Sequence, residues 1–383
     1  MRFRAAAFAL SIAFWISPAS RTLAAPDFAR WGAETLELIR KDLWLPGPGL
    51  YAEQAPDENG RPAAPAFMWG VGVQLSALAA AAKLEPEKYL AETKAYADAI
   101  QVYWLEHDGI AGFDVQPGPK SSDRYYDDNA WLVLALAEVS EIAGERKFLE
   151  RAEATFRFVM SGEDDKLGGG LYWRENFLTT KNTCTNAPAI ASALRLHQLT
   201  GKQEYLETAR RIHAWTKRHL QDDDGLYWDN IRLDGRVDRR KFTYNTALMI
   251  RANCLFHEIT GEPTWLVEAR RMADAAEQRW VGEDGSVSDA GRFAHLLMES
   301  FMAVHEREND PKRLATVERV LTHVREKLRS PDGRYPHRWD RPSRGSLRES
   351  MLLNQASPAR AFWVAAEVFR EEPAEPAEKK PEP

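Results

Sequence analysis

Three apolar segments of the chain end in the same short turn, and this repetition constrains the fold more than any other feature. The segments "ALAEVSEIAGERKFL", "ALRLHQLTGKQEYL" and "NCLFHEITGEPTWL" each place a Gly after the apolar run and an aromatic-Leu pair shortly after it. A Gly at that point is a helix C-terminal signal, and another helix starts at once. "AAAAKLEPEKYL" and "HERENDPKRL" repeat the joint with Pro in place of Gly. The joints divide the chain into helical hairpins of about 50 to 60 residues, the length range of stacked helix pairs.

The two helices of each hairpin differ in their hydrophobic pattern. The second helices are amphipathic, as in "ERKFLERAEATFRFVM". A separate helix, from about Pro26 to Leu43, precedes the first hairpin, and the last buried helix, near Arg348 to Phe369, has no partner after it. Pairing these two closes a ring of six inner and six outer helices, so the sequence predicts an all-α (α/α)6 toroid. The first helices are apolar almost all round, which is typical of buried helices, and are expected to start near Met68, Asp127, Thr185, Tyr244, Phe293 and Arg348.

The connections between hairpins indicate where function lies. Connections from an inner to an outer helix are only a few residues long. Those from an outer to an inner helix are long and rich in Gly, Asp and aromatic residues, as in "EDDKLGGGLYWRENFLTTKNT" and "QDDDGLYWDNIRLDGRVDRRKF". Because the inner helices run parallel, the long loops and the inner N-termini meet at one end of the ring. Long loops on a rigid scaffold usually carry function, so we expect the functional site at that end.

Both ends of the chain differ from the helical part. "MRFR", "AAAFALSIAFWI" and "TLAA" have the basic, apolar and small-residue regions of an export signal, expected over residues 1–24. The helical domain is expected over residues 26–370, and "REEPAEPAEKKPEP" predicts a disordered Pro/Glu-rich tail over residues 371–383. We therefore expect a protein exported to the periplasm or outside the cell, without stable membrane insertion.

Several classes of chemistry find no support in the sequence. The net charge of −6 gives no basic footprint for nucleic acid. There is no CxxC, HExxH or Gly-Lys phosphate loop, so neither a metal site nor a cofactor is expected. The acidic stretches "QDDDG" and "EDDKLGGG" lack EF-hand spacing and are interpreted as solvated turns. Cys184 and Cys254 lie at different depths of two inner helices, which predicts two free, buried thiols. His197 and His257 precede equivalent turns and are expected to be structural.

Two adjacent acids, Asp127 and Asp128, stand at the start of the inner helix "YYDDNAWLVLALAE". Asp is a preferred N-cap, and acids in a first turn complement the helix dipole. An N-cap needs one side chain, however, and this pair lies at the loop-rich end beside Tyr126 and Asn129. Adjacent carboxyl groups are coupled, because ionising one raises the pKa of the other. A protonated acid beside an ionised one is what glycoside hydrolysis needs, so catalysis is favoured and is compatible with capping. Spacing alone leaves retention and inversion both open.

The motifs "YYDDNAW", "GGGLYW", "KNTCTNAPA", "GLYWDNI" and "TYNTA", in this order, resemble those of glycoside hydrolase family 76, over about residues 30 to 365. The resemblance implies an endo-α-1,6-mannanase or a related transglycosylase with a retaining mechanism. It implies that Asp127 attacks the anomeric carbon, while Asp128 protonates the leaving oxygen and later activates water. The chain departs from the family's "TYNQG" at Thr246 and Ala247. If the family's Gln holds a sugar hydroxyl, the subsite preference differs here, which leaves the exact polymer open.

Other residues at the same end are candidates for holding substrate. Asp229 matches an acidic position of the family, with a turn-forming role as the alternative. For the Asn residues the alternative is helix capping, and for the aromatic residues it is core packing. The candidates are Trp69, Tyr126, Asn129, Tyr172, Trp173, Asn186, Trp228, Asp229, Tyr244 and Asn245.

The favoured function is a secreted, monomeric glycoside hydrolase that acts on an α-mannan-like polysaccharide or oligosaccharide without a cofactor. A sugar epimerase or isomerase on the same toroid is one alternative. Its acid/base groups are usually histidines on the inner helices, and His295 is the only His at an inner-helix start here. A non-catalytic glycan-binding protein is the other alternative, although pure binding does not need a coupled pair of acids.

Overall fold

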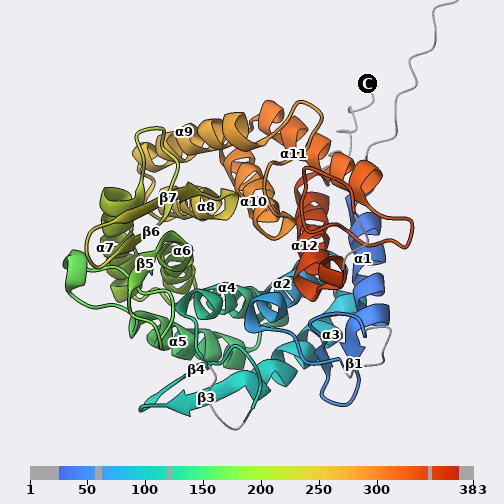
Figure 1. The fold of residues 1–383 in the computed structure, drawn as a ribbon, viewed down its shortest axis with the longest axis horizontal. Helices are drawn as coiled ribbons and strands as arrows, with labels where there is room; N and C mark the ends of the chain where they lie inside the picture. The colour runs from blue at the N-terminus through green and yellow to red at the C-terminus, as the bar shows by residue number, and fades with distance from the viewer. Residues whose placement is uncertain (1–25, 57–62, 119–122, 344–346, 371–383) are drawn as a thin grey trace, which may run out of the picture.

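A computed structural model describes residues 26–56, 63–118, 123–343 and 347–370. The expected export signal and the expected C-terminal tail lie outside the described residues. In the described part, twelve α-helices form two concentric rings (Figure 1). The inner helices are α2 (Met68–Leu84), α4 (Tyr126–Ala143), α6 (Thr183–Thr200), α8 (Thr243–Thr260), α10 (Gly291–Glu308) and α12 (Leu352–Val368). The outer helices are α1 (Phe28–Leu43), α3 (Pro86–Ala99), α5 (Arg146–Met160), α7 (Gln203–Leu220), α9 (Pro263–Trp280) and α11 (Pro311–His323).

The ring closes where the sequence predicted, between the first and the last helix. Helix α12 packs against both α1 and α2. The Trp31 and Phe362 rings meet edge to face with centroids 5.6 Å apart, and the Phe28 and Phe369 centroids lie 5.0 Å apart. The (α/α)6 prediction is therefore confirmed. Five inner helices start within two residues of the predicted positions, but α12 starts at Leu352, after a short 3-10 helix, η4 (Leu347–Ser350).

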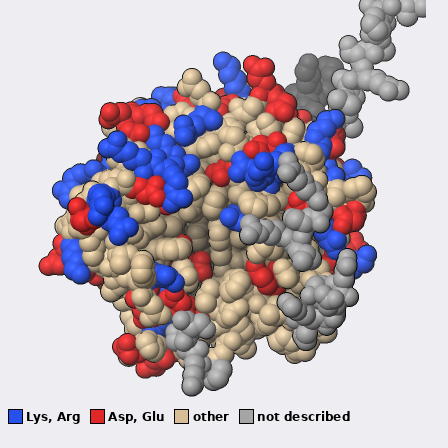
Figure 2. All heavy atoms as spheres, in the orientation of Figure 1, with Lys and Arg blue, Asp and Glu red and all other residues tan. Residues whose placement is uncertain are grey.

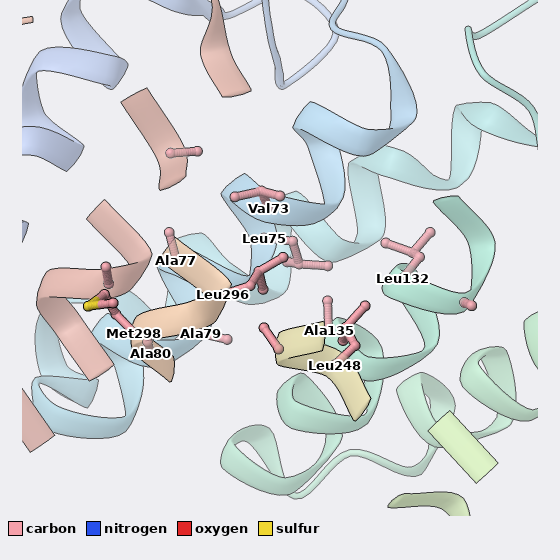
Figure 3. Close-up of a cluster of buried hydrophobic side chains, with 14 of the residues drawn as sticks. Val73, Leu75, Ala77, Ala79, Ala80, Leu132, Ala135, Leu248, Leu296 and Met298 are labelled. Atoms are coloured by element: carbon pink, nitrogen blue, oxygen red, sulfur yellow. The ribbon is translucent and has the colours of Figure 1, made fainter. Parts of the chain in front are cut away.

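The inner helices form the core of the toroid. Helix α2, "MWGVGVQLSALAAAAKL", is buried along most of its length and alanine-rich, which lets its neighbours approach closely. Ten core side chains of α2, α4, α8 and α10 are labelled in Figure 3, and all except Met298 are aliphatic. The outer helices bury a single stripe, which on α5 includes Phe148, Ala152, Phe156 and Val159. None of the described helices combines the length and the apolar character that crossing a bilayer requires.

Three of the short inner-to-outer turns have the same backbone conformation. Gly144, Gly201 and Gly261 follow α4, α6 and α8 with φ values of 64°, 71° and 69°, in the left-handed region that glycine adopts without strain. The Nδ1 atoms of His197 and His257 lie 2.9 and 3.2 Å from backbone carbonyl oxygens five residues ahead. Each ring thus donates a hydrogen bond that fixes its turn, and the predicted structural role of both histidines is confirmed. Both cysteines are free and buried, as predicted.

The long outer-to-inner loops contain strands and short helices that the sequence analysis did not anticipate. Strand β5 lies in the loop before α6, whereas β6 and β7 lie in the loop before α8. Because β5 pairs with β6, and β6 with β7, a three-stranded sheet joins these two consecutive loops. The two remaining sheets are antiparallel hairpins, β1–β2 and β3–β4. The strands are β1 (Trp44–Leu45), β2 (Leu50–Tyr51), β3 (Trp104–His107), β4 (Ile110–Phe113), β5 (Thr180–Asn182), β6 (Trp228–Arg232) and β7 (Val237–Lys241). The short helices besides η4 are η1 (Ile100–Tyr103), η2 (Lys166–Gly168) and η3 (Val324–Leu328).

The two acidic turns lie at the surface, as the sequence interpretation expected, but each also surrounds a buried lysine. The buried ammonium group of Lys181 donates to the Asp164 carboxylate at 2.6 Å and to three backbone carbonyl oxygens of the "EDDKLGGG" segment. The "QDDDG" turn holds Lys241 in the same way, through Asp222 and, at 2.6 Å, Asp224. In both turns the ammonium group of a lysine from a later strand donates hydrogen bonds to the oxygen atoms of the turn and balances its negative charge.

The fourth residue of several inner helices clamps the loop that precedes the helix. Asn129 is fully buried; its Oδ1 accepts from the Phe113 backbone N–H at 2.8 Å, and its Nδ2 donates to the carbonyls of Phe113 and Tyr125. Asn186, the fourth residue of α6, makes the same three bonds with Leu171 and Asn182. The amides of Asn129 and Asn186 are therefore saturated by the protein, so the structure assigns them to folding rather than to the predicted sugar contacts.

The same position explains the departure from the family motif. In α12 it is occupied by Gln355, whose amide exchanges two bonds with the Tyr335 backbone, at 2.9 and 3.0 Å. In α8 it is Thr246, fully buried, whose hydroxyl accepts from the Tyr227 N–H at 3.1 Å. The side chain at position 246 therefore binds the backbone of the preceding loop at Tyr227. The suggested effect of Thr246 on a sugar subsite is not supported.

Asn129→Leu is expected to destabilise the fold, because it leaves buried backbone groups of Phe113 and Tyr125 without partners. Losing three buried hydrogen bonds corresponds to about 3 kcal/mol in the free energy of unfolding. Urea unfolding followed by circular dichroism measures this loss. Asn230→Leu, at a half-buried asparagine outside the clamp positions, is the matched control. Equal stability of the Asn129 variant and the wild type would contradict the clamp.

Thr246→Gln, which restores the family's residue, is expected to leave the size distribution of cleavage products unchanged, within about twofold in rate. Gln355 shows that a Gln side chain fits this clamp in the same fold. Chromatography of digestion products measures the outcome. A shift toward longer or shorter products would return position 246 to the list of substrate contacts.

Candidate active site

Asp127 and Asp128 are the second and third residues of α4, so the helix start holds both at the loop-rich end of the ring. The N-cap is Tyr125, which makes no side-chain capping bond. The pair therefore does not occupy the N-cap position itself, although Asp127 accepts from the first-turn N–H of Asp128 and both acids lie where the helix dipole favours negative charge. Both side chains are partly exposed.

Asp127 is surrounded by hydrogen-bond donors. The indole Nε1 of Trp173 donates to its Oδ2 at 2.9 Å, and the backbone N–H of Asp128 donates to its Oδ1 at 3.0 Å. The thiol of Cys184 lies nearby and lowers the pKa of Asp127. Within the described ranges, no comparable donor contacts the Asp128 carboxyl group. Hydrogen bonds to a carboxylate favour its ionised form, so the two acids differ in environment although they are adjacent in sequence.

The pKa values of the pair follow from this difference. Burial raises the pKa of Asp127 to about 7, and the bonds from Trp173 and the Asp128 backbone limit the rise. Burial and the charge of Asp127 raise the pKa of Asp128 well above its usual value, and Asp123 adds to the effect. Because the two groups are coupled, the first ionisation falls on Asp127 and leaves Asp128 protonated.

A third acid, Asp229 on β6, lies near the pair. Its carboxylate is nearly buried, 3.1 Å from the Asn230 Nδ2, 3.5 Å from the Asn245 Nδ2 and 3.6 Å from an Arg240 nitrogen. Burial is the main cause that raises the pKa of Asp229. Cys184 and Tyr244 lie near each other, and both interact electrostatically with Asp127 and Asp229.

Three aromatic rings from the first turns of α2, α8 and α10 stack beside this group. Tyr244 and Phe293 lie nearly parallel with centroids 4.2 Å apart, and Trp69 stacks on Phe293 at 5.6 Å and on Tyr244 at 6.5 Å. Helices α2 and α8 face each other across the ring, because α4 and α6 separate them on one side and α10 and α12 on the other. The stack, called the aromatic floor below, therefore crosses the axis of the toroid.

The remaining predicted aromatic contacts have other partners. Tyr126 and Tyr172 are buried and pack with Phe158 in a small separate cluster, so core packing corrects their predicted sugar contacts. Trp228 is half-buried, and its indole donates to Asp222 at 3.2 Å rather than to the acid pair. The structure thus groups six predicted residues with Asp127, either directly or through the floor: Asp128, Trp173, Asp229, Tyr244, Asn245 and Trp69.

Sequence reasoning missed three residues of this group. Phe293 could have been noticed, because it stands in the first turn of an inner helix, as Trp69 and Tyr244 do. Nothing in the sequence placed the thiol of Cys184 next to Asp127, or Arg240 next to Asp229. Within the described ranges, His, Cys, Asp and Glu side chains form no group of three or more that could hold a metal ion.

A ring of six helical hairpins with a coupled pair of carboxyl groups and aromatic side chains at one end defines the class of (α/α)6 glycoside hydrolases. The model of glycosyl hydrolase family 76 matches residues 49–310, and the chain belongs to this family.

Three relatives illustrate the likeness. The structure of a family 76 α-mannanase from Bacteroides thetaiotaomicron has a TM-score of 0.84 at 29% identity, over 89% of this chain and 96% of that chain. A variant of the Salegentibacter sp. HEL1_6 α-1,6-mannanase, inactive through replacement of two consecutive Asp by Asn and bound to α-1,6-mannotriose, shares the fold: TM-score 0.76, 24% identity, 89% of this chain and 100% of that one. A mannan endo-1,6-α-mannosidase of Candida glabrata is 27% identical over 46% of this chain, and the match spans only 43% of that protein's length.

Proposed function

We propose that the protein is an exported, retaining glycoside hydrolase that cleaves α-1,6-linked mannan within the chain. Family membership supports a mannan-cleaving hydrolase, and the names of relatives from Bacteroides, Salegentibacter and Candida point to α-mannan. The observation that carries the mechanism is the unequal environment of the pair, with Trp173 and a backbone N–H bonded to Asp127 only. Export rests on the sequence of residues 1–24, which lie outside the described residues.

The proposed reaction proceeds in two displacements. Ionised Asp127 attacks the anomeric carbon and forms a glycosyl ester, while Asp128 gives its proton to the departing glycosidic oxygen. Asp128, now ionised, removes a proton from water, and the resulting hydroxide displaces Asp127 from the anomeric carbon. The two inversions give net retention. In this proposal Asp229, to which the buried amide of Asn245 donates, holds sugar hydroxyls next to the reacting carbon, and the aromatic floor contacts a sugar ring.

The experiment that tests this proposal is proton NMR of fresh digests of α-1,6-mannotetraose. Retention predicts that the α-anomer of the new reducing end appears first and mutarotates later. Initial formation of the β-anomer would overturn the retaining mechanism. Intact tetrasaccharide after long incubation would overturn the hydrolase function itself. A transglycosylase would give products longer than the substrate, because sugar acceptors compete with water for the same intermediate.

A further inference from the structure

A cavity of about 460 Å³ lies inside the ring, and its lining residues do not include Asp127 or Asp128. It is lined by all six inner helices, from Trp69 in the aromatic floor to Lys83 and Glu367 in the last turns of α2 and α12. Because Lys83 and Glu367 are partly exposed, this cavity, called the rear chamber below, opens at the end of the ring opposite the acid pair. The floor thus separates it from the candidate active site. Figure 2 shows the opposite, loop-rich face, which is hollowed at the centre of the ring on the side of the candidate active site.

Ion pairs line the opening of the rear chamber. They connect neighbouring inner helices, α2 with α12, α4 with α6, and α8 with α10. The pairs are Lys83–Glu367, Arg195–Glu141 and Arg307–Glu258. Because each charge has a partner on an adjacent helix, the opening presents little net charge to an approaching molecule.

Deeper in the chamber, charged side chains are buried. Arg360 on α12 donates to the Glu138 carboxylate and to the Ser76 carbonyl, both at 2.8 Å, and lies 3.3 Å from Glu299. Arg251 lies 3.3 Å from the same Glu299 carboxylate. Buried ion pairs stabilise a fold less than well-packed aliphatic side chains of similar volume would. A packed core needs none of them, so their presence around an open chamber indicates binding rather than packing.

The groups that line the chamber match the chemistry of a neutral sugar. Arg251 is partly exposed and, among the described residues, hydrogen-bonds through Nη1 to Glu299, so further N–H groups remain for a ligand. The Nδ1 of His295 lies 3.3 Å from the Gly291 carbonyl and donates to it, which leaves Nε2 as an acceptor. Trp131 lines the wall as a partly exposed aromatic surface.

We propose that the rear chamber is a second carbohydrate site, which binds a neutral saccharide of one or two hexose rings. Its volume lies within the range of small-molecule pockets, about 300 to 1,000 Å³. Paired charges disfavour an ionic ligand, whereas hydroxyl groups can accept from Arg251 and donate to His295 and Glu138, with a sugar face on Trp131. The inference does not depend on the proposed reaction, because the chamber and the acid pair lie on opposite sides of the floor.

Crystals of the full chain carrying Asp128→Asn, soaked in α-1,6-mannobiose, test the proposal. We expect density for sugar rings in the rear chamber as well as beside Asp127. The front site is the internal control for soaking. Sugar beside Asp127 together with ordered water alone in the chamber would overturn the second site.

A chamber-filling variant provides the solution test. Ala303 is partly exposed and lines the chamber on α10, so Ala303→Trp places an indole where the sugar would lie. Ala91→Trp, at an exposed position of the outer helix α3, is the matched control. With D-mannose as the probe in ligand-observed NMR, we expect Ala303→Trp to weaken binding at this site by about tenfold or more, and Ala91→Trp to leave it unchanged.

Circular dichroism melting of both variants checks the fold. If the Ala303 variant remains folded and binds D-mannose as tightly as the Ala91 variant, the proposal fails. Should the Ala303 variant not fold, Trp131→Phe replaces it, because the shortened ring weakens the same site and is expected to reduce the NMR signal of the bound sugar. An unchanged signal in that variant would also overturn the proposal.

Discussion

Asp127→Asn and Asp128→Asn are each expected to abolish cleavage of linear α-1,6-mannan, with losses in kcat/KM of about 10⁴-fold for the nucleophile and about 10³-fold for the acid. Both amides are nearly isosteric with the acids, so the losses report chemistry rather than folding. Reducing-sugar release measures both losses. Asp234→Asn, at an exposed acid in the turn between β6 and β7, is the control that should retain full activity.

An aryl glycoside separates the two roles. A dinitrophenyl leaving group departs without protonation, so the Asp128 variant still forms the glycosyl ester with Asp127. Its second step is slow, because no base activates water. Added azide needs no base and is expected to restore turnover and give an α-glycosyl azide. The Asp127 variant has no nucleophile and should not yield that product. Rescue with retention in the Asp127 variant, and none in the Asp128 variant, would exchange the assigned roles.

The ring was predictable because its signals are local and repeated. A Gly after an apolar run, followed by an aromatic-Leu pair, recurs in successive hairpins, and each copy supports the others. The start of α12 was less accurate, because the segment before it forms η4 rather than a continuous helix. The strands of the long loops were missed, since β5, β6 and β7 pair across two separate loops and their partners cannot be recognised within one segment.

The sequence predicted where in the fold the candidate site lies, but not which side chains contact one another there. An Asn at the start of an inner helix can cap the helix, clamp the preceding loop or bind a sugar, because each role needs an amide. For Asn129 and Asn186 the role depends on whether a backbone segment 15 or 16 residues earlier comes within hydrogen-bond distance, which the sequence does not show. Tyr172 forms an isolated β-bridge with Lys181, and Trp173 lies in the bend that follows it. Tyr172 packs into the protein, while Trp173 contacts Asp127. A sequence shows that both rings are present but not which one faces the acids.

Trp173→Phe is expected to lower kcat/KM on α-1,6-mannan by about 10- to 100-fold, the equivalent of one hydrogen bond to a charged group. The indole N–H stabilises ionised Asp127, so its removal raises the pKa of that carboxyl group. The reaction needs Asp127 ionised, and activity is lost as the pH falls through this pKa. The acid limb of the kcat/KM profile should therefore move to higher pH in the variant, from a wild-type value set by a pKa of about 7.

Trp228→Phe is the matched control, because its indole donates to Asp222 instead of the acid pair. It should leave the acid limb in place, whatever it does to KM. The direction of the pH shift carries the argument, since a ring that merely stacks on a sugar has no reason to change the ionisation of Asp127. If Trp173→Phe raises KM while the acid limb stays where it was, Trp173 acts as the stacking platform that the sequence suggested, and the bond to Asp127 has no part in positioning the nucleophile.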